Sequence, residues 1–285
     1  MQMIAYSVLN SEIVPAESAS ISAQDRGFRF GDGVFETIAV YDGVPYQWAL
    51  HMERLAGGLA ALRIDYDIRG LKPLCKALLQ KNQTEQGFIR IAISRGVGSA
   101  GYRPTGHSPT CLIETMPERT HDGTPCRLHV SSWRRPAATQ LPIGVKLSHG
   151  IGNTLALLEA ADHACEDAIM LSASGMVAET SSANLFWVKE GTLFTPSLET
   201  GCVAGTTRAA IIRLSPMPVM QVEAPVSALE HSEEIFMSNV RYGLRACVLA
   251  HTASTIGAYR ALEQCSALLA DDQKRETLTE SLHWR

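Results

Sequence analysis

The sequence predicts a two-domain chain that mixes helices and strands, of the α/β or α+β class, with a smaller N-terminal and a larger C-terminal domain. Its 285 residues are enough for two domains, and a hydrophobic content of 46% can fill two cores. Strand-like and helix-like patterns alternate on both sides of the stretch 117–125, which is polar and contains Gly and Pro. We therefore expect domains at 1–118 and 125–285, joined by a linker at 119–124.

Each element is predicted from a local pattern. Strands alternate their side chains between two faces, whereas helices repeat their apolar residues every three or four positions. The strand pattern occurs at 34–40, 88–94 and 110–115, with a turn at Asp42-Gly43 after the first strand. The helix pattern occurs at 50–62, 71–80, 154–165 and 207–214, and through the final forty residues.

Composition argues against several classes of protein. A net charge of -4 without a basic run argues against a nucleic-acid partner. No apolar stretch approaches the length of a membrane span, and no charged segment precedes a long apolar one at the N-terminus, so we expect a cytoplasmic protein. The seven cysteines include no C-x-x-C pair and indicate reduced thiols. His163 and Cys165 are possible metal ligands, but they continue a helical pattern and lack a second ligand pair, so no metal site is predicted.

A lysine in an apolar setting is the first chemical signal. Lys146 ends the run Leu-Pro-Ile-Gly-Val-Lys, where burying an ammonium is costly. Either its side chain reaches outward to water, or its neutral amine serves Schiff-base chemistry with an aldehyde cofactor. Pyridoxal 5'-phosphate is such a cofactor, and it also requires an acidic residue for its pyridine nitrogen and a cradle for its phosphate. Glu179 is the candidate acid, although a lone glutamate is usually a surface residue.

Candidate phosphate ligands occur in two places. Gly205-Thr206-Thr207-Arg208 precedes an apolar helical stretch, and the amides at a helix N-terminus bind a phosphate dianion well. The same pattern is also typical of an ordinary helix cap. Arg54, in His-Met-Glu-Arg-Leu, is the second candidate, and its alternative is a solvated arginine on a helix.

Together these motifs resemble the fold-type IV enzymes that depend on pyridoxal phosphate, a family that includes branched-chain and D-amino-acid aminotransferases and aminodeoxychorismate lyases. The resemblance extends from near residue 20 to near residue 250, and its matching stretches are 25–37, 51–55, 93–98, 145–146, 179–184 and 205–208. It implies a Schiff base on Lys146 and a contact between Glu179 and the pyridine nitrogen. It also implies a phosphate site made of Arg54, Thr206, Thr207, Ser238 and Asn239. One departure is His149, where the family often has an asparagine.

The resemblance also bears on the reaction. Phe35, Thr37 and Ala39 share one face of the strand 34–40, and in the family this face is turned to the cofactor. Branched-chain aminotransferases are expected to carry glycine and arginine at the positions of Thr37 and Ala39. D-amino-acid aminotransferases are expected to carry arginine and histidine where this chain has Ala100 and Tyr102.

Aminodeoxychorismate lyases are similar to this chain in having a threonine at the Thr37 position and an asparagine at that of Asn239, although they often have arginine where Ala100 stands. The resemblance therefore favours a lyase that makes 4-aminobenzoate and pyruvate from 4-amino-4-deoxychorismate in folate biosynthesis. Lys146, Thr37 and Glu179 would be its catalytic residues. Its substrate pocket would be lined by Phe35, Thr37, Tyr102 and Arg103.

Three alternatives stay open. Thr37 can be a β-branched strand former without a catalytic role. The chain can be an aminotransferase for D- or branched-chain amino acids with a 2-keto acid acceptor. It can also be a non-enzymatic binding module, although such a module needs neither Lys146 nor Glu179. The resemblance further implies a homodimer in which residues 98–103 complete the neighbouring active site.

Overall fold

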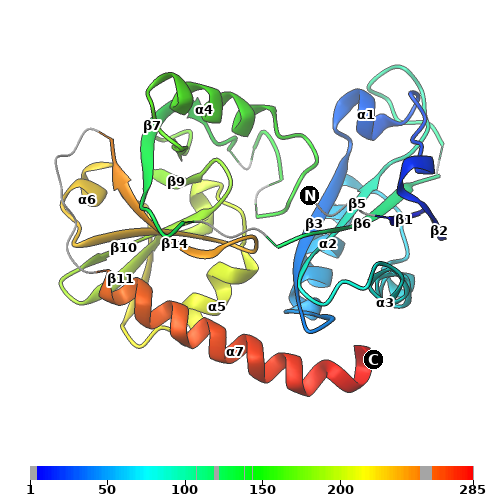
Figure 1. The fold of residues 1–285 in the computed structure, drawn as a ribbon. Coiled ribbons are helices and arrows are strands. Elements are labelled where there is room, and N and C mark those ends of the chain that lie inside the picture. The colour runs from blue at the N-terminus through cyan, green and yellow to red at the C-terminus, as the bar shows by residue number, and fades with distance from the viewer. Residues whose placement is uncertain are drawn as a thin grey trace. The chain divides into compact units, whose positions relative to one another are not determined.

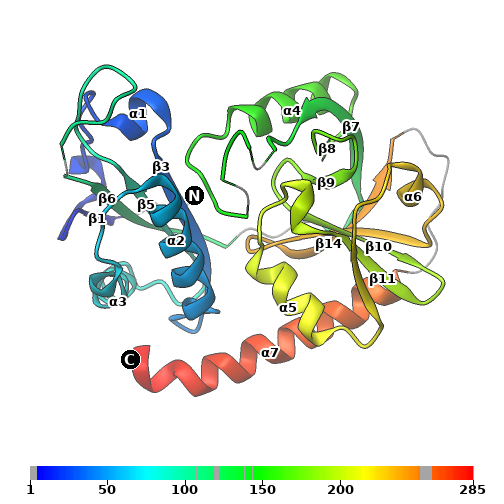
Figure 2. The same cartoon turned by 180° about the vertical axis from the view of Figure 1, so that it is seen from behind.

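The computed structural model describes residues 5–106, 108–118, 122–137, 139–142, 144–250 and 259–284. The chain divides into two compact units, each built around its own sheet (Figure 1, Figure 2). The first unit comprises Met1–Arg119, Val145–Gly150 and Gln273–Arg285, and the second comprises Thr120–Gly144 and Ile151–Asp272. The segment that carries Lys146 thus clusters with the first unit. Residues 119–121 of the predicted linker lie outside the described residues, and the predicted domain limits stay a prediction.

The first unit contains an antiparallel six-stranded sheet in the order β2-β1-β6-β5-β3-β4. Its strands are β1 (Tyr6–Leu9), β2 (Glu12–Pro15), β3 (Gly33–Tyr41), β4 (Val44–Pro45), β5 (Gly87–Ser94) and β6 (Thr110–Met116). The predicted strands are β3, β5 and β6, and the predicted turn has positive φ at both Asp42 (51°) and Gly43 (76°), as tight hairpins require. The β1-β2 hairpin was not predicted, because each strand is only four residues long and β2 is mostly exposed.

The helices α2 (Trp48–Leu62) and α3 (Leu71–Asn82) cover one face of this sheet. The unit also contains α1 (Arg26–Phe30), which contacts β5, and single 3₁₀ turns at Ala16–Ser18 and Ile68–Gly70. The predicted helices at 50–62 and 71–80 are α2, which packs on β3, and α3, which packs on β1 and β6. Val34, Ile38 and Val40 of β3 are buried in the core beneath these helices. Strand alternation therefore turns Phe35 and Thr37 to the opposite, half-buried face of the sheet.

The second unit contains an eight-stranded mixed sheet in the order β12-β11-β10-β13-β14-β7-β8-β9. Its strands are β7 (Cys126–Arg134), β8 (Asp167–Leu171), β9 (Val177–Thr180), β10 (Asn184–Lys189), β11 (Thr192–Pro196), β12 (Val219–Val222), β13 (Glu234–Asn239) and β14 (Gly243–Leu249). The helix α4 (Ile151–Asp162) packs on β7 and β8, and α5 (Thr206–Leu214) packs on β13. Shorter helices lie at Leu198–Thr200 and at α6 (Ser227–Glu230). The predicted mixture of helices and strands is confirmed.

Two boundary predictions are wrong. The helix α4 ends at Asp162, so His163 and Cys165 do not continue it, and Ala164 between them has a positive φ of 53° that stops a helix. The final forty residues are not all helical, because β14 extends to Leu249. Residues 251–258 lie outside the described residues, and the 25-residue helix α7 (Arg260–Trp284) follows them.

The described residues contain neither a cluster of metal ligands nor a helix that could span a membrane. Within the described residues, no group of three or more His, Cys, Asp or Glu side chains is placed to hold a metal ion. In that same part of the chain, every helix is too short or too polar to cross a membrane.

Candidate active site

The segment Val145–Gly150 is hydrogen-bonded to the N-terminal half of β3. Phe35 N-H donates to the Lys146 carbonyl at 3.1 Å, and the pairing is antiparallel with Val34 opposite Leu147. Residues opposite each other on antiparallel strands point to the same face. Leu147 therefore packs against the core with Val34, and Lys146 shares the other face with Phe35. This pairing fixes the direction of the lysine side chain.

The histidine that departs from the family pattern lies against a glycine. Gly31 ends α1 with a φ of 65°, a left-handed conformation that favours glycine. A Cβ added to Gly31 would lie 2.7 Å from the Cβ of His149, so the close approach of the two segments also requires glycine.

An amine, a hydroxyl and a guanidinium gather on the face of β3 opposite the core. Lys146 Nζ lies 4.6 Å from the centre of the Phe35 ring, and Thr37 follows on the same face. Arg90 of β5 pairs directly opposite Thr37, and its Cζ lies 5.1 Å from the centre of the Phe35 ring. Its Nη1 also lies 3.6 Å from Glu114 Oε2. The sequence reasoning missed Arg90, because the alternation of a strand is readable but its register with a neighbour is not.

A buried charge cluster lies on the core side of β3. Arg54 donates from Nε and Nη2 to the two carboxylate oxygens of Glu36, at 2.7 and 2.6 Å, and His51 Nδ1 lies 2.7 Å from Glu36 Oε2. Burial by itself raises the pKa of Glu36, but the hydrogen bonds from Arg54 and His51 outweigh it and lower that pKa to about 2. Burial lowers the pKa of His51. Arg54 is therefore not the solvated arginine of the alternative interpretation, since its side chain is only 9% exposed.

The other two predicted pocket residues lie on a loop. Tyr102 and Arg103 follow β5 and are exposed, Tyr102 by 87%. The Tyr102 ring lies 5.6 Å from that of Phe30 in α1. Within the first unit, the structure thus brings Lys146, Phe35 and Thr37 together and presents Tyr102 and Arg103 on an exposed segment.

In the second unit, Glu179 is buried and surrounded by donors. Its Oε1 lies 3.1 Å from Arg135 Nε, and its Oε2 accepts from Val203 N-H at 3.0 Å and from Asn184 Nδ2 at 3.4 Å. Only 4% of the residue is exposed, which excludes the surface interpretation. These contacts hold the carboxylate in one orientation. Arg135 was not predicted, because it follows β7 far from Glu179 in the sequence and no motif marked it.

The predicted phosphate motif opens a helix. Gly205 is the N-cap of α5, and Thr206 and Thr207 are buried in its first turn without a side-chain cap. Asn184 Nδ2 also donates to the Val203 carbonyl at 2.9 Å, which ties the loop before this helix to β10. A Cβ on Gly205 would lie 2.0 Å from Asn184 Oδ1, so glycine is required there. The helix N-terminus is therefore presented on a well-anchored loop, a setting suited to an anion.

Ser238 and Asn239, the other predicted phosphate ligands, are the last two residues of β13, which pairs with β10. Asn184 pairs opposite Ser238 across β10 and β13, and α5 packs on β13. Ser238 is 1% exposed, and its hydroxyl has no hydrogen-bond partner within the described part of the chain. Asn239 Nδ2 donates to the Ser182 carbonyl at 3.3 Å, while its Oδ1 accepts from Arg241 N-H at 2.8 Å. A buried hydroxyl without a partner fits a site for a polar ligand.

A second carboxylate that the sequence reasoning missed shapes the turn after Glu179. Asp167 is buried at the start of β8, and Thr180 Oγ1 donates to its Oδ2 at 3.0 Å. Ser181 donates to Asp167 Oδ1 from both its hydroxyl and its backbone N-H. The Thr-Ser-Ser run after Glu179 thus surrounds the Asp167 carboxylate with hydrogen-bond donors. This contact explains the polar residues of the stretch 179–184 by a structural role.

The comparisons with known proteins identify the family. The amino-transferase class IV family matches residues 33–248, so the chain belongs to this family and is an enzyme whose cofactor is pyridoxal 5'-phosphate. The family, the fold type and the cofactor predicted from the sequence are confirmed.

Relatives of both candidate reactions align with most of the chain. It is 31% identical over 252 residues to the branched-chain-amino-acid aminotransferase of Escherichia coli strain K12, covering 82% of this chain and 81% of that enzyme. It is 29% identical over 243 residues to the aminodeoxychorismate lyase of Bacillus subtilis strain 168, covering 81% and 82%. The crystal structure of 4-amino-4-deoxychorismate lyase from Pseudomonas aeruginosa matches with a TM-score of 0.79 at 28% identity, covering 93% and 98%. Similarity to these relatives therefore does not distinguish the aminotransferase reaction from the lyase reaction.

Proposed function

We propose that this enzyme is an aminodeoxychorismate lyase that converts 4-amino-4-deoxychorismate to 4-aminobenzoate and pyruvate. The observation that supports this best is the position of Thr37 on the same sheet face as Lys146, beside the Phe35 ring that the lysine contacts. The elimination needs a base for one proton and an acid for another. The amine of Lys146 and the hydroxyl of Thr37 suit these two roles.

We propose the cofactor ligands that the family resemblance implies. Lys146 would form the Schiff base, Glu179 would contact the pyridine nitrogen, and the phosphate ligands would be Arg54, Thr206, Thr207, Ser238 and Asn239. The buried hydroxyl of Ser238 and the N-terminus of α5 at Gly205 fit an anionic phosphate, which would accept hydrogen bonds from both. When bound, pyridoxal phosphate supplies an aldehyde carbon and an electron-accepting ring.

The chain's own residues then divide the proton transfers. Lys146 takes the proton from C4 of the substrate, the carbon that bears the amino group. Thr37 gives a proton to the ether oxygen as the bond between that oxygen and the ring breaks, so the side chain leaves as enolpyruvate and becomes pyruvate. Glu179, oriented by Arg135, would hold a proton on the pyridine nitrogen of the bound cofactor. Loss of the C4 proton and the ether makes the ring aromatic, which drives the reaction forward.

Arg90 narrows the distinction from an aminotransferase. Ala39, Ala100 and Tyr102 stand where aminotransferases are expected to have side chains that bind the substrate carboxylate. The structure nevertheless puts the guanidinium of Arg90 directly opposite Thr37. A guanidinium binds a carboxylate well. We propose that Arg90 binds a carboxylate of 4-amino-4-deoxychorismate, since this substrate carries carboxylates as amino acids do.

The second candidate is an aminotransferase that acts on D- or branched-chain amino acids with a 2-keto acid acceptor. Two observations favour it: the 31% identity to a branched-chain-amino-acid aminotransferase, and Arg90 beside Thr37. Both reactions would use Lys146 and Glu179 in the same way. They differ in whether the ether oxygen is expelled or a second keto acid is required.

One assay separates the two. The purified holoenzyme is incubated with 4-amino-4-deoxychorismate alone and, separately, with L-leucine or D-alanine plus 2-oxoglutarate. We expect 4-aminobenzoate and pyruvate in equal amounts without a keto acid, and much slower transamination of both amino acids. Rapid keto-acid-dependent turnover with no 4-aminobenzoate would identify the aminotransferase instead.

We further propose that the active enzyme is a homodimer. The exposed side chains of Tyr102 and Arg103 suit a loop that completes a neighbouring subunit's site, because a closed site excludes water from the cofactor. Sedimentation of the holoenzyme at micromolar concentration checks this. A fully active monomer would contradict the proposal.

A further inference from the structure

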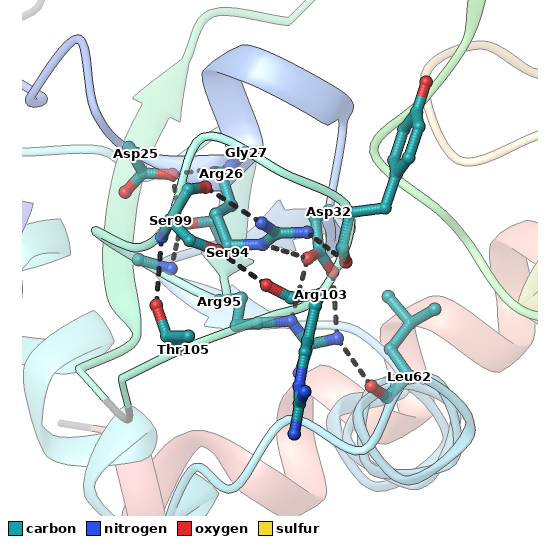
Figure 3. A network of polar contacts seen from close by, with 12 residues as sticks. Asp25, Arg26, Gly27, Asp32, Leu62, Ser94, Arg95, Ser99, Arg103 and Thr105 are labelled. Carbon is teal, nitrogen blue, oxygen red and sulfur yellow. Dashed lines mark hydrogen bonds and ion pairs between the residues drawn. The ribbon is translucent and has the colours of Figure 1, made fainter.

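A buried arginine contacts the exposed loop that follows β5. Arg26, the first residue of α1, is only 3% exposed. Its Nη1 donates to the carbonyls of Ser99 at 3.2 Å and Gly101 at 2.7 Å, and its Nη2 donates to that of Tyr102 at 3.2 Å. Figure 3 shows its guanidinium between the loop and Asp32. Three carbonyls of one loop therefore converge on one side chain.

The other hydrogen bonds of the loop are mostly local. Ser99 Oγ donates to the Arg103 carbonyl at 2.6 Å, and Gly98 N-H donates to the Gln24 carbonyl at 3.4 Å. The loop contains Gly98 and Gly101, whose backbones lose the most conformational freedom when they are ordered. Ser99 N-H donates to Thr105 Oγ1 at 3.2 Å across the loop. A Cβ on Gly98 would lie 2.9 Å from the Cδ of Arg26, so the loop packs directly on the stem of this arginine. The shape of the loop thus depends on Arg26.

A second arginine shares the same carboxylate but contacts a different segment. Arg26 Nε donates to Asp32 Oδ2 at 2.8 Å, and Arg95 donates to Asp32 Oδ2 at 2.8 Å and Oδ1 at 3.0 Å. Arg95 also donates to the carbonyls of Leu62 at 2.7 Å and Arg63 at 3.1 Å, at the end of α2. The two arginines thus share Asp32, and only Arg26 contacts the loop through its side chain. Arg95 is a natural control for Arg26.

We propose that Arg26 is a positioning residue for substrate binding, which orders the loop carrying Tyr102 and Arg103 before the substrate arrives. The inference rests on the proposed function in assigning this loop to the substrate pocket. A loop that is already ordered avoids the entropy cost of ordering on binding. Loss of the Arg26 guanidinium should therefore weaken substrate binding more than it slows the chemistry. Lysine cannot reproduce the contact, because a compact ammonium does not span three carbonyls and a carboxylate as a guanidinium does.

The test compares four holoenzymes: the wild type, Arg26→Lys, Arg26→Met and Arg95→Lys. Hydrogen exchange, followed by mass spectrometry over 98–105, reports the order of the loop without any substrate. Steady-state kinetics use whichever amino substrate the wild type turns over. We expect the loop amides of the Arg26 variants to exchange faster. Their KM should rise by about tenfold, because substrate binding must then order the loop, and their kcat should change by less than about twofold.

The outcomes separate the inference from its alternatives. Arg95→Lys should change neither the exchange nor KM, and all variants should keep the visible absorbance of bound cofactor. If Arg26→Met fails to fold, Arg26→Lys decides, because it keeps a positive charge beside Asp32. Unchanged KM in an Arg26 variant with a loosened loop would overturn the inference, as would equal effects of Arg26→Lys and Arg95→Lys. Absence of 4-aminobenzoate in the wild type would instead overturn the proposed lyase and leave the exchange result standing.

Discussion

The two units surround their candidate site residues in opposite ways. In the second unit, Glu179 is 4% exposed and has donors on both carboxylate oxygens, from Arg135, Val203 and Asn184. In the first unit, Lys146 and Thr37 lie half-buried on the open face of a sheet. A buried network with satisfied partners is rigid and intolerant of change, whereas side chains on an open face can be exchanged without unfolding the sheet.

This difference indicates where reaction specificity resides. A buried acid for the pyridine nitrogen serves every reaction that withdraws electrons into the ring, so an aminotransferase and a lyase need it equally. In the proposed mechanism, Thr37 on β3 acts only in the lyase reaction, and Arg90 of β5 pairs opposite it. We therefore expect substitutions in the second unit to affect both reactions alike, and substitutions on β3 to affect one reaction more than the other.

The largest effect is expected from Lys146→Ala. In the proposed mechanism this amine is both the covalent anchor and the general base, so turnover should fall by at least about 1000-fold. Borohydride reduction of the wild type should bleach its yellow colour and leave the reduced adduct on Lys146, located by mass spectrometry. The exposed Lys189 is the control, and Lys189→Ala should keep colour and activity. An adduct on another lysine would refute the assignment.

The next effect is expected from Glu179→Gln, which removes a charge but nearly preserves shape. A neutral amide does not hold a proton on the pyridine nitrogen, so lyase and transaminase rates should both fall by about 100-fold or more, while cofactor stays bound. Glu190→Gln, at an exposed position, should be silent. Retention of near wild-type turnover in Glu179→Gln would show that this carboxylate has no catalytic role.

A smaller and selective effect is expected from Thr37→Val. Without the hydroxyl, the ether oxygen loses its proton donor, so formation of 4-aminobenzoate should slow by about 10- to 100-fold. Any slow transamination should change little, because it requires no such donor. Thr37→Ser keeps the hydroxyl and should recover most of the rate in the same coupled assay for pyruvate. Equal losses in Thr37→Val and Thr37→Ser would leave Thr37 as a strand former only.

The sequence predicted local elements better than contacts between distant segments. Glu179 and the helix start at Thr206 stand in local motifs, and local motifs survive folding because their geometry is set by neighbouring residues. Arg135 and Arg90 reach the site through strand placement and register, which depend on distant segments and leave no local pattern. The pairing of the Lys146 segment with Val34 and Phe35 of β3 likewise leaves no local pattern, because it joins distant segments.

The smallest effect is expected on thermal stability, from the buried cluster of Glu36, Arg54 and His51 on the core side of β3. Because the pKa of Glu36 lies at about 2, below its ordinary 4.5, its stabilisation is complete above pH 4.5 and is lost as the pH falls towards 2. The lowered pKa of His51 adds to this loss, since protonation below its ordinary value of 6.5 favours the unfolded chain. Melting temperatures of the wild type should therefore fall more steeply on acidification than those of Glu36→Gln, which should itself melt several degrees lower at pH 7 because Arg54 loses a buried partner. Parallel curves for the two proteins between pH 7 and pH 3, followed by circular dichroism, would mean that this cluster does not stabilise the fold.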